Sequence, residues 1–131
     1  MKVLDSDTCI GILRGRAEVL ERRSAEIDEV ATTWVTASEL FYGAAKSSKP
    51  EANAALIVQF LNTLTVLTPD LASARLFGEL KARLAINGRI VADADLFIAA
   101  ISVSLGATLV TGNRKHYERF PGLVIEDWLR A

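Results

Sequence analysis

Val3-Leu4-Asp5-Ser6-Asp7-Thr8 is the stretch that decides the fold, because an apolar pair runs directly into polar residues. Val3 and Leu4 predict a short buried strand that ends at Asp5. Residues 8–14 then predict a short apolar helix, for which Gly15 is a suitable stop. The chain therefore opens with a short strand that is followed at once by a helix.

The same alternation continues through the rest of the chain. Strands are predicted at 29–35, 65–67, 108–111 and 123–125, and helices at 17–29, 36–46, 51–64, 70–87 and 93–105. Short strands that are apolar on both faces and alternate with helices are typical of a parallel sheet covered on both sides. We therefore predict a single α/β domain over residues 1–131, a three-layer α/β/α arrangement with a short, mainly parallel central sheet.

Composition narrows the functional classes. Half of the 131 residues are hydrophobic, which argues against a disordered tail. The 15 basic and 16 acidic residues give a net charge of −1, so bulk positive charge does not drive binding to nucleic acid, although a local basic patch could. One cysteine excludes an internal disulfide and a Cys-rich zinc site, and one histidine excludes a His-pair metal motif.

No segment has the pattern of a targeting signal or a membrane anchor. The first 13 residues are interrupted by Asp5 and Asp7, so they lack the apolar core of a signal peptide. The longest apolar candidate, 96–110, is shorter than the roughly 18 to 20 residues that cross a membrane. We expect a cytoplasmic protein without a membrane segment.

Polar residues gather where the predicted strands end. In a parallel sheet the ligand site lies beyond the carboxyl ends of the strands, so residues that follow different strands are expected to meet. Carboxylates that converge there would raise each other's pKa values, and a hard divalent cation such as Mg²⁺ would neutralise them. The residues concerned are Asp5, Ser6, Asp7, Thr36, Glu39, Asp93, Asp95, Thr111 and Asn113. This pattern predicts a metal-dependent hydrolase of phosphodiesters or phosphate esters.

Each of these residues also has a structural explanation. Thr36 to Glu39 fits a capping box, and Asp93 is a suitable N-cap for the apolar helix that follows it. Asp95 would then lie in the first turn, where the helix dipole favours a negative charge. Ser6 or Asp7 could cap the helix at 8–14, and Asn113 could be a turn residue. Asp5 is the least easily explained in this way, because it ends a buried strand.

Three other features are more typical of structure than of catalysis. His116 lies in the polar run 114–116 and is expected on a solvated face. Cys9 falls on the apolar face of the first helix and is expected in the core. Two groups of basic residues could bind phosphates but are also typical of ordinary surface charge. One group is Arg14, Arg16, Lys46 and Lys49, and the other is the segment 114–119.

Taken together, these motifs resemble those of the PIN-domain ribonucleases, specifically the VapC toxins of bacterial and archaeal toxin–antitoxin pairs. The likeness rests on four stretches: Val3 to Ile10, Ser38 to Lys46, Asp95 to Ala100, and Thr111-Gly112-Asn113 followed by Tyr117 and by Pro121 to Trp128. No single stretch is specific, but all four appear in the family's order over almost the whole chain.

The resemblance implies an endoribonuclease that uses Mg²⁺ or Mn²⁺ and a metal-activated water. Asp5, Glu39 and Asp95 would bind the metal, Asn113 would complete the catalytic set, and Ser6 and Thr111 would support it. Asn113 offers an oxygen but no charge where many members carry aspartate, so Asp93 or Asp7 would have to compensate at a second metal site. Gly112 stands where relatives often carry a larger residue, which would open the pocket.

The resemblance also implies partners. VapC-like toxins are typically homodimers, each neutralised by a cognate VapB-like antitoxin whose tail lies over the active site and places a basic residue among the carboxylates. The implied substrate is structured cellular RNA, either a tRNA or a ribosomal RNA.

Two alternatives belong to other functional classes. Asp5-Ser6-Asp7 matches the Asp-x-Asp motif of haloacid-dehalogenase-like phosphatases, in which the first aspartate is the nucleophile, but no acidic pair follows the late strand. The second alternative is a non-catalytic binding module, either response-regulator-like or a degenerate PIN domain. A receiver domain would need a late lysine that is missing at the expected place, and a degenerate PIN domain would have lost the acidic residues.

Overall fold

The computed structural model describes residues 1–130, and short strands alternate with helices along this part of the chain. The strands are β1 (Lys2–Leu4), β2 (Val30–Thr33), β3 (Thr65–Leu67), β4 (Thr108–Val110) and β5 (Val124–Glu126). The helices are α1 (Ser6–Leu13), α2 (Ala17–Ala25), α3 (Trp34–Ala45), α4 (Pro50–Leu61), α5 (Leu71–Ile86), α6 (Asp93–Ser104) and α7 (Arg114–Tyr117).

All five strands form one parallel sheet in the order β3-β2-β1-β4-β5. The central strand β1 places Val3 beside Ala31 of β2 and Leu109 of β4. Successive residues of a strand point to opposite faces, and both faces are apolar here. Val3 belongs to one buried cluster and Leu4 to the other, which is why these strands are apolar on both faces.

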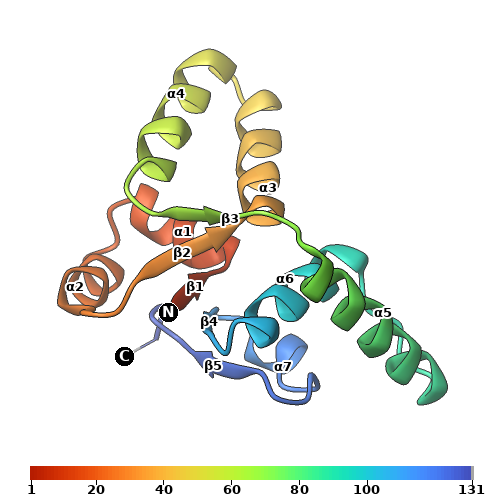
Figure 1. Ribbon diagram of the computed structural model, residues 1–131. Coiled ribbons are helices and arrows are strands. Elements are labelled where there is room, and N and C mark those ends of the chain that lie inside the picture. Colours follow the sequence, from red (N-terminus) through yellow and green to blue (C-terminus); the bar gives the residue numbers. More distant parts are fainter. Residues whose placement is uncertain (131) are drawn as a thin grey trace.

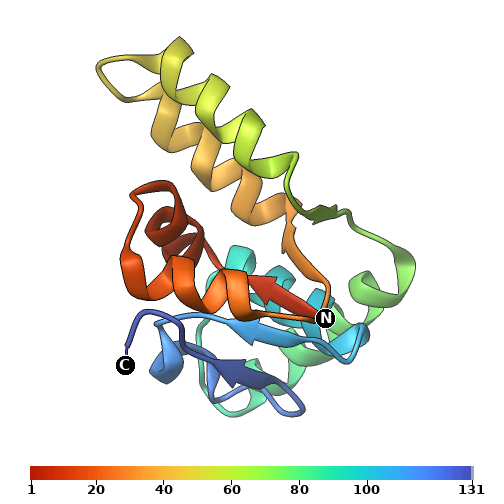
Figure 2. The same cartoon turned by 90° about the vertical axis from the view of Figure 1, so that its left-hand side faces the viewer.

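Helices cover both faces of the sheet and give three layers (Figure 1). One apolar cluster joins the sheet to α5, α6 and α7, and the other joins it to α1, α2, α3 and α4. The α3–α4 pair extends away from the sheet as an arm, as the side view shows (Figure 2). The predicted three-layer α/β/α class with a short parallel sheet is confirmed.

Two helix caps differ from prediction. Strand β2 stops at Thr33, whose side chain caps α3 by accepting a hydrogen bond from the Thr36 amide at 3.2 Å, so the helix begins at Trp34. The capping box proposed for Thr36 and Glu39 is therefore wrong. Helix α6 is preceded by Ala92, which makes no side-chain cap, and the predicted capping role of Asp93 is also wrong. Within residues 1–130, no helix combines the length and the apolar character needed to span a membrane.

Candidate metal-dependent active site

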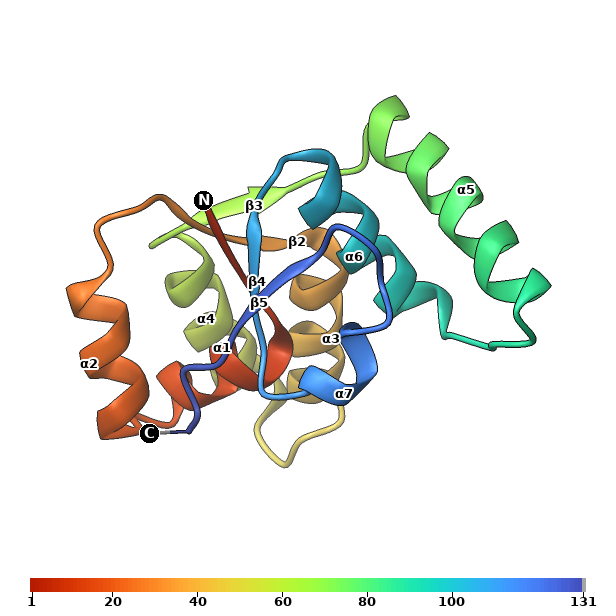
Figure 3. The same ribbon diagram turned by 90° about the horizontal axis from the view of Figure 1, so that it is seen from below.

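The carboxyl ends of the central strands bring distant parts of the chain together. Asp5 directly follows β1, Thr111 directly follows β4, and α7 comes three residues later. Seen from below, the start of α1, the end of β4 and α7 gather at the same end of the sheet (Figure 3). This is the edge at which ligands bind in open parallel sheets.

Asp5 is buried and rigidly held at this edge. One side-chain oxygen accepts the Ser6 amide at 2.9 Å, and the other accepts the Thr111 hydroxyl at 2.9 Å. Thr111 is itself fully buried and accepts the Asn113 amide at 3.0 Å. Asp5 is thus also the N-cap of α1, a capping role that was not predicted for it. Its position is fixed by hydrogen bonds from the start of α1 and from the residue that follows β4.

Asp95 occupies the first turn of α6, as predicted, and is held from α7. The Tyr117 hydroxyl donates to its Oδ1 at 3.0 Å, and the His116 Nε2–H donates to its Oδ2 at 2.7 Å. Burial and the nearby carboxylates raise the pKa of Tyr117, so its hydroxyl keeps its proton and remains a donor. The expectation that His116 lies on a solvated face is wrong, because the ring is half-buried against Asp95.

Glu39 lies on α3 and brings a third carboxylate toward the same region. Burial raises its pKa, and the charges of Asp5 and Asp95 raise it further. The pKa of Asp5 is raised to about 6, mainly by burial and also by the charges of Asp7 and Asp95, despite the opposing hydrogen bonds. The three predicted carboxylates therefore share one electrostatic environment, in which their negative charge is not neutralised.

The donor chemistry of this region fits a hard divalent cation. Carboxylate oxygens are the ligands that Mg²⁺ prefers. A bound cation would offset the burial and the repulsion that together raise the pKa values of Asp5 and Glu39. Within residues 1–130, no three His, Cys, Asp or Glu side chains lie close enough to form a preassembled metal-binding group. Mg²⁺ is usually held by only one or two carboxylates together with waters and substrate phosphates, so a tighter cluster is not required.

The other predicted site residues contribute backbone hydrogen bonds or an ion pair rather than side chains directed at the carboxylates. Ser6 supports Asp5 through its backbone amide, and Asn113 supports Thr111 in the same way while its side chain stays exposed. Asp93 lies away from the carboxylates and forms an exposed ion pair with Lys81 at 2.9 Å. The structure therefore gives no support to Asp93 as a member of the site.

Asp7 fastens the turn after β4 to the start of α1. Its Oδ1 accepts the Thr8 amide at 2.7 Å and its Oδ2 accepts the Gly112 amide at 2.9 Å. On the other side of Gly112, the Arg130 guanidinium donates to the glycine carbonyl at 2.9 Å. The expectation of an opened pocket at Gly112 is wrong, because a Cβ there would lie 2.6 Å from Leu129 Cδ1 and 3.0 Å from Asp7 Oδ2.

We expect Gly112→Ala to destabilise the fold by about 1 to 3 kcal/mol, because an added methyl group must displace Leu129 or Asp7. Gly78→Ala is the matched control: it lies within α5 with nothing within 4 Å of the added Cβ, and should be neutral or stabilising. Urea unfolding of both variants measures the difference. Equal midpoints for the two variants would contradict the tight packing at Gly112.

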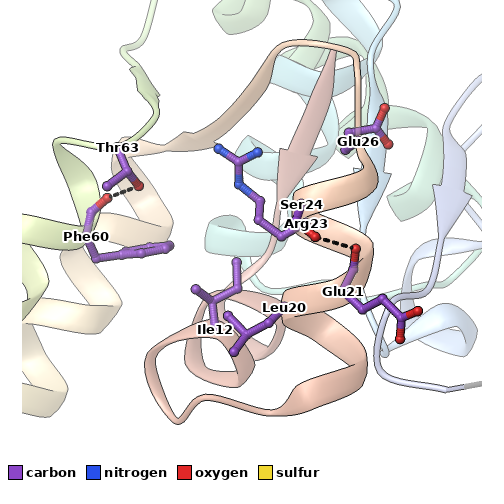
Figure 4. Close-up of a pocket in the computed structure, with 8 residues that line it drawn as sticks. All are labelled: Ile12, Leu20, Glu21, Arg23, Ser24, Glu26, Phe60 and Thr63. Atoms are coloured by element: carbon purple, nitrogen blue, oxygen red, sulfur yellow. Dashed lines mark hydrogen bonds between the residues drawn. The ribbon is translucent and has the colours of Figure 1, made fainter.

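A long groove runs between the α1–α2 pair and the α3–α4 arm, and its part next to Glu39 is mainly apolar. One hollow of about 680 Å³ includes Glu39 in its lining, together with Ile10, Leu13, Leu40 and Leu56 among others. A second hollow of about 670 Å³ adjoins it, and both include Ile12, Phe60 and Thr63. In Figure 4, Ile12 and Leu20 lie on one side of the second hollow, and Phe60 and Thr63 lie opposite.

Sequence reasoning missed the contacts that His116 and Tyr117 make with Asp95. The available signal was their position: His116 and Tyr117 come six and seven residues after the end of β4, at the edge where the strand-end residues were already expected to meet. The short helix α7 was not predicted, since four residues are too few to show a helical period.

Comparison with known proteins gives concordant matches over nearly the whole chain. The PIN domain family matches residues 2–122. The tRNA(fMet)-specific endonuclease VapC of Salmonella typhimurium is 38% identical over 127 residues, covering 96% of both chains. Ribonuclease VapC of Haemophilus influenzae is 36% identical over 128 residues, covering 97% of both. The DNA-bound VapBC structure from Salmonella typhimurium has a chain with a TM-score of 0.91 and 37% identity, covering 97% of each chain.

Proposed function

Since the chain belongs to the PIN-domain family and to its VapC ribonucleases, we propose that it is an Mg²⁺- or Mn²⁺-dependent endoribonuclease that cleaves structured cellular RNA. The observation that carries this proposal is the convergence of Asp5, Glu39 and Asp95 in one electrostatic environment at the carboxyl edge of the sheet. The proposed catalytic set is Asp5, Glu39, Asp95 and Asn113, in a single domain that covers residues 1–131.

Within this proposal the chain's own residues bind and orient. Asp5, Glu39 and Asp95 would hold the divalent cation. When bound, the cation stabilises charge on the phosphate and lowers the pKa of a coordinated water. Thr111 fixes one oxygen of Asp5, while His116 and Tyr117 fix both oxygens of Asp95. Such anchored side chains lose little conformational freedom when they engage a cation and substrate.

Cation binding should weaken as the pH falls through about 6. Asp5 must be ionised to bind a cation, and its pKa of about 6 means that a proton competes for it below that pH. We expect Mg²⁺ or Mn²⁺ affinity to rise from pH 5 to about pH 6.5 and then to level off. Titration calorimetry measures the affinity, and buffers of different ionisation enthalpy count the released proton. A flat affinity between pH 5 and pH 7.5 would exclude Asp5 as a ligand.

The phosphatase alternative finds little support in the geometry. In an Asp-x-Asp phosphatase the second aspartate must be available to the substrate as a proton donor and acceptor. Here Asp7 is engaged by the amides of Thr8 and Gly112 on its two oxygens. The degenerate PIN alternative requires the loss of the acidic residues, and Asp5, Glu39 and Asp95 are all present.

The proposed protein partner is a VapB-like antitoxin. Similar chains occur in VapBC complexes, from Salmonella typhimurium for example. The groove between the α1–α2 pair and the α3–α4 arm supports this assignment, because it is lined by apolar side chains and includes Glu39 at its edge. An amphipathic segment laid into the groove could place a basic residue beside the carboxylates. We also propose that the toxin is a homodimer, which sedimentation analysis would test.

The proposed substrate class is tRNA or ribosomal RNA, and the decisive experiment is done in cells. Wild type and Asp5→Asn are expressed from an inducible promoter without antitoxin, and RNA 5′ ends are sequenced. We expect growth arrest and a discrete new 5′ end with wild type only. With both proteins shown to be folded, the absence of new ends would favour the non-catalytic alternative, and identical ends in both strains would remove Asp5 from the site.

A further inference from the structure

Basic side chains without carboxylate partners are concentrated near α7. Of the 15 lysines and arginines, six form ion pairs in the described part of the chain: Lys2, Arg16, Arg22, Arg75, Lys81 and Arg130. Five of the remaining nine fall between residues 83 and 119, namely Arg83, Arg89, Arg114, Lys115 and Arg119. The near-neutral net charge of the chain therefore conceals a local excess of positive charge.

Four of these cations line two adjoining hollows. One, of about 280 Å³, lies between the end of α5 and the segment after α7, and it includes Arg83, Arg89 and Arg119. The other, of about 380 Å³, is lined by Arg89, Lys115, Arg119 and Glu118. Arg89 and Arg119 belong to both hollows, so the two form one continuous surface. We call the surface made by Arg83, Arg89, Lys115 and Arg119 the α5–α7 basic patch.

Ordinary structural roles do not account for the patch. Arg83 lies in the last turn of α5, where a cation is favoured by the helix dipole. That explanation does not reach Arg89, which is in the loop after α5, or Arg119, which follows α7. The only carboxylate in either lining is Glu118, and within residues 1–130 it forms no ion pair. Cations held close together without partners repel one another, and a bound polyanion would remove that repulsion.

Helix α7 connects the patch to the candidate active site. Lys115 of the patch is the neighbour in sequence of His116, whose ring contacts Asp95. The short helix α7 therefore presents His116 and Tyr117 to Asp95, and Lys115 to the second hollow. A polymer that ran from the carboxylates across α7 would meet Lys115 and then the arginines that line the same hollow.

We propose that the α5–α7 basic patch binds the phosphodiester backbone of the RNA strand that flanks the cleaved bond. This inference rests on the proposed ribonuclease function, because it takes the carboxylates as the place of cleavage. Arginine and lysine are the residues that contact phosphate oxygens, and such contacts position a nucleic acid without reading its sequence. The patch thus sets the register of the strand, while the choice of base is made elsewhere.

The test compares two double variants with the same change of charge. Arg89→Gln/Arg119→Gln removes two patch cations, and Arg22→Gln/Arg75→Gln removes two exposed arginines outside the patch. Both are placed in an Asp5→Asn background, and binding of fluorescein-labelled, unfractionated bacterial tRNA is measured by anisotropy from 50 to 200 mM salt. Loss of two phosphate contacts should lower the slope of log affinity against log salt by about 1.4 to 1.8. The control should keep the slope of its parent.

Cleavage by the same double variants, with Asp5 restored, provides a second readout. We expect the patch variant to raise KM with little change in kcat, because the cations bind the strand outside the reacting phosphate. An unchanged salt slope, or an equal drop in the control, would overturn the proposal. Equal binding and equal loss with duplex DNA of the same length would overturn the assignment to RNA. If the Asp5→Asn protein binds tRNA through the patch but the wild-type protein cuts no RNA, the patch stands as an RNA-binding surface and the ribonuclease proposal fails.

Discussion

Replacing Asp5 by asparagine is expected to lower RNA cleavage by at least about 100-fold while the fold remains intact. Changes to residues that merely support a metal ligand cost about 10- to 100-fold, so loss of a ligand's charge should cost at least as much. Asparagine keeps the size of the side chain, and its carbonyl oxygen can still accept the Ser6 amide. Cleavage of the substrate RNA under Mg²⁺ and under Mn²⁺ measures the effect.

Stability separates this interpretation from simple misfolding. Because the folded-state pKa of Asp5 is raised from 3.8 to about 6, the folded protein holds a proton that the unfolded chain releases between these values. The free energy of unfolding of the metal-free protein should therefore fall as the pH rises from about 4 to about 6. Asp5→Asn lacks this penalty and should be more stable than wild type above pH 6, by up to about 3 kcal/mol.

Asp7→Asn is the matched control for Asp5→Asn. It also removes one carboxylate charge at the end of β1, but Asp7 holds backbone amides rather than facing Asp95. We expect a loss of stability of about 1 kcal/mol from the weakened Gly112 contact, and a much smaller loss of cleavage. Equal losses of cleavage in the two variants would argue for a shared role of the two aspartates, as in an Asp-x-Asp phosphatase.

The fold was largely predictable because each strand is buried on both faces. Val3 and Leu4 point to opposite sides of the sheet and each packs in an apolar cluster. A short strand with two successive apolar residues therefore predicts helices on both faces of the sheet. Strand β3 was placed at its observed residues, whereas helix starts were displaced by two residues at α3 and at α1. Those starts depend on the residue at which each strand ends. Thr33 ends β2 and Asp5 follows β1, and each of them also caps the next helix.

The candidate site was predictable in its carboxylates but not in their partners. Asp5 follows from the rule that strand ends meet, because that rule needs only the order of the elements. Glu39 and Asp95 lie on helices, and only the resemblance to the PIN-domain motifs singled them out from capping roles. The contacts of His116 and Tyr117 with Asp95 depend on how a four-residue helix turns against α6, which no periodicity in the sequence encodes. Asp93 was misplaced for a similar reason, since only the packing of α5 on α6 provides Lys81 as its partner.

Asp95→Asn and Asp93→Asn make the same chemical change two residues apart on one helix, and we expect very different results. Asp95 accepts hydrogen bonds from Tyr117 and His116, and its charge raises the pKa values of Asp5 and Glu39. Its replacement should lower cleavage by at least about 100-fold. Asp93 is exposed and paired with Lys81, and surface changes of this kind usually alter free energies by less than about 0.5 kcal/mol. Its replacement should alter cleavage by no more than about twofold.

Two measurements distinguish a ligand at Asp95 from a purely structural residue. Calorimetric titration with Mg²⁺ should give weaker binding for Asp95→Asn and unchanged binding for Asp93→Asn. Glu39 provides an independent check, because its pKa is raised in part by the charge of Asp95 and should fall toward its usual value in Asp95→Asn, as carboxyl NMR titration would report. If Asp93→Asn were the more damaging change, the reacting face of α6 would be the one that carries the Lys81 ion pair. Asp95 would then be a structural anchor for α7 rather than a metal ligand.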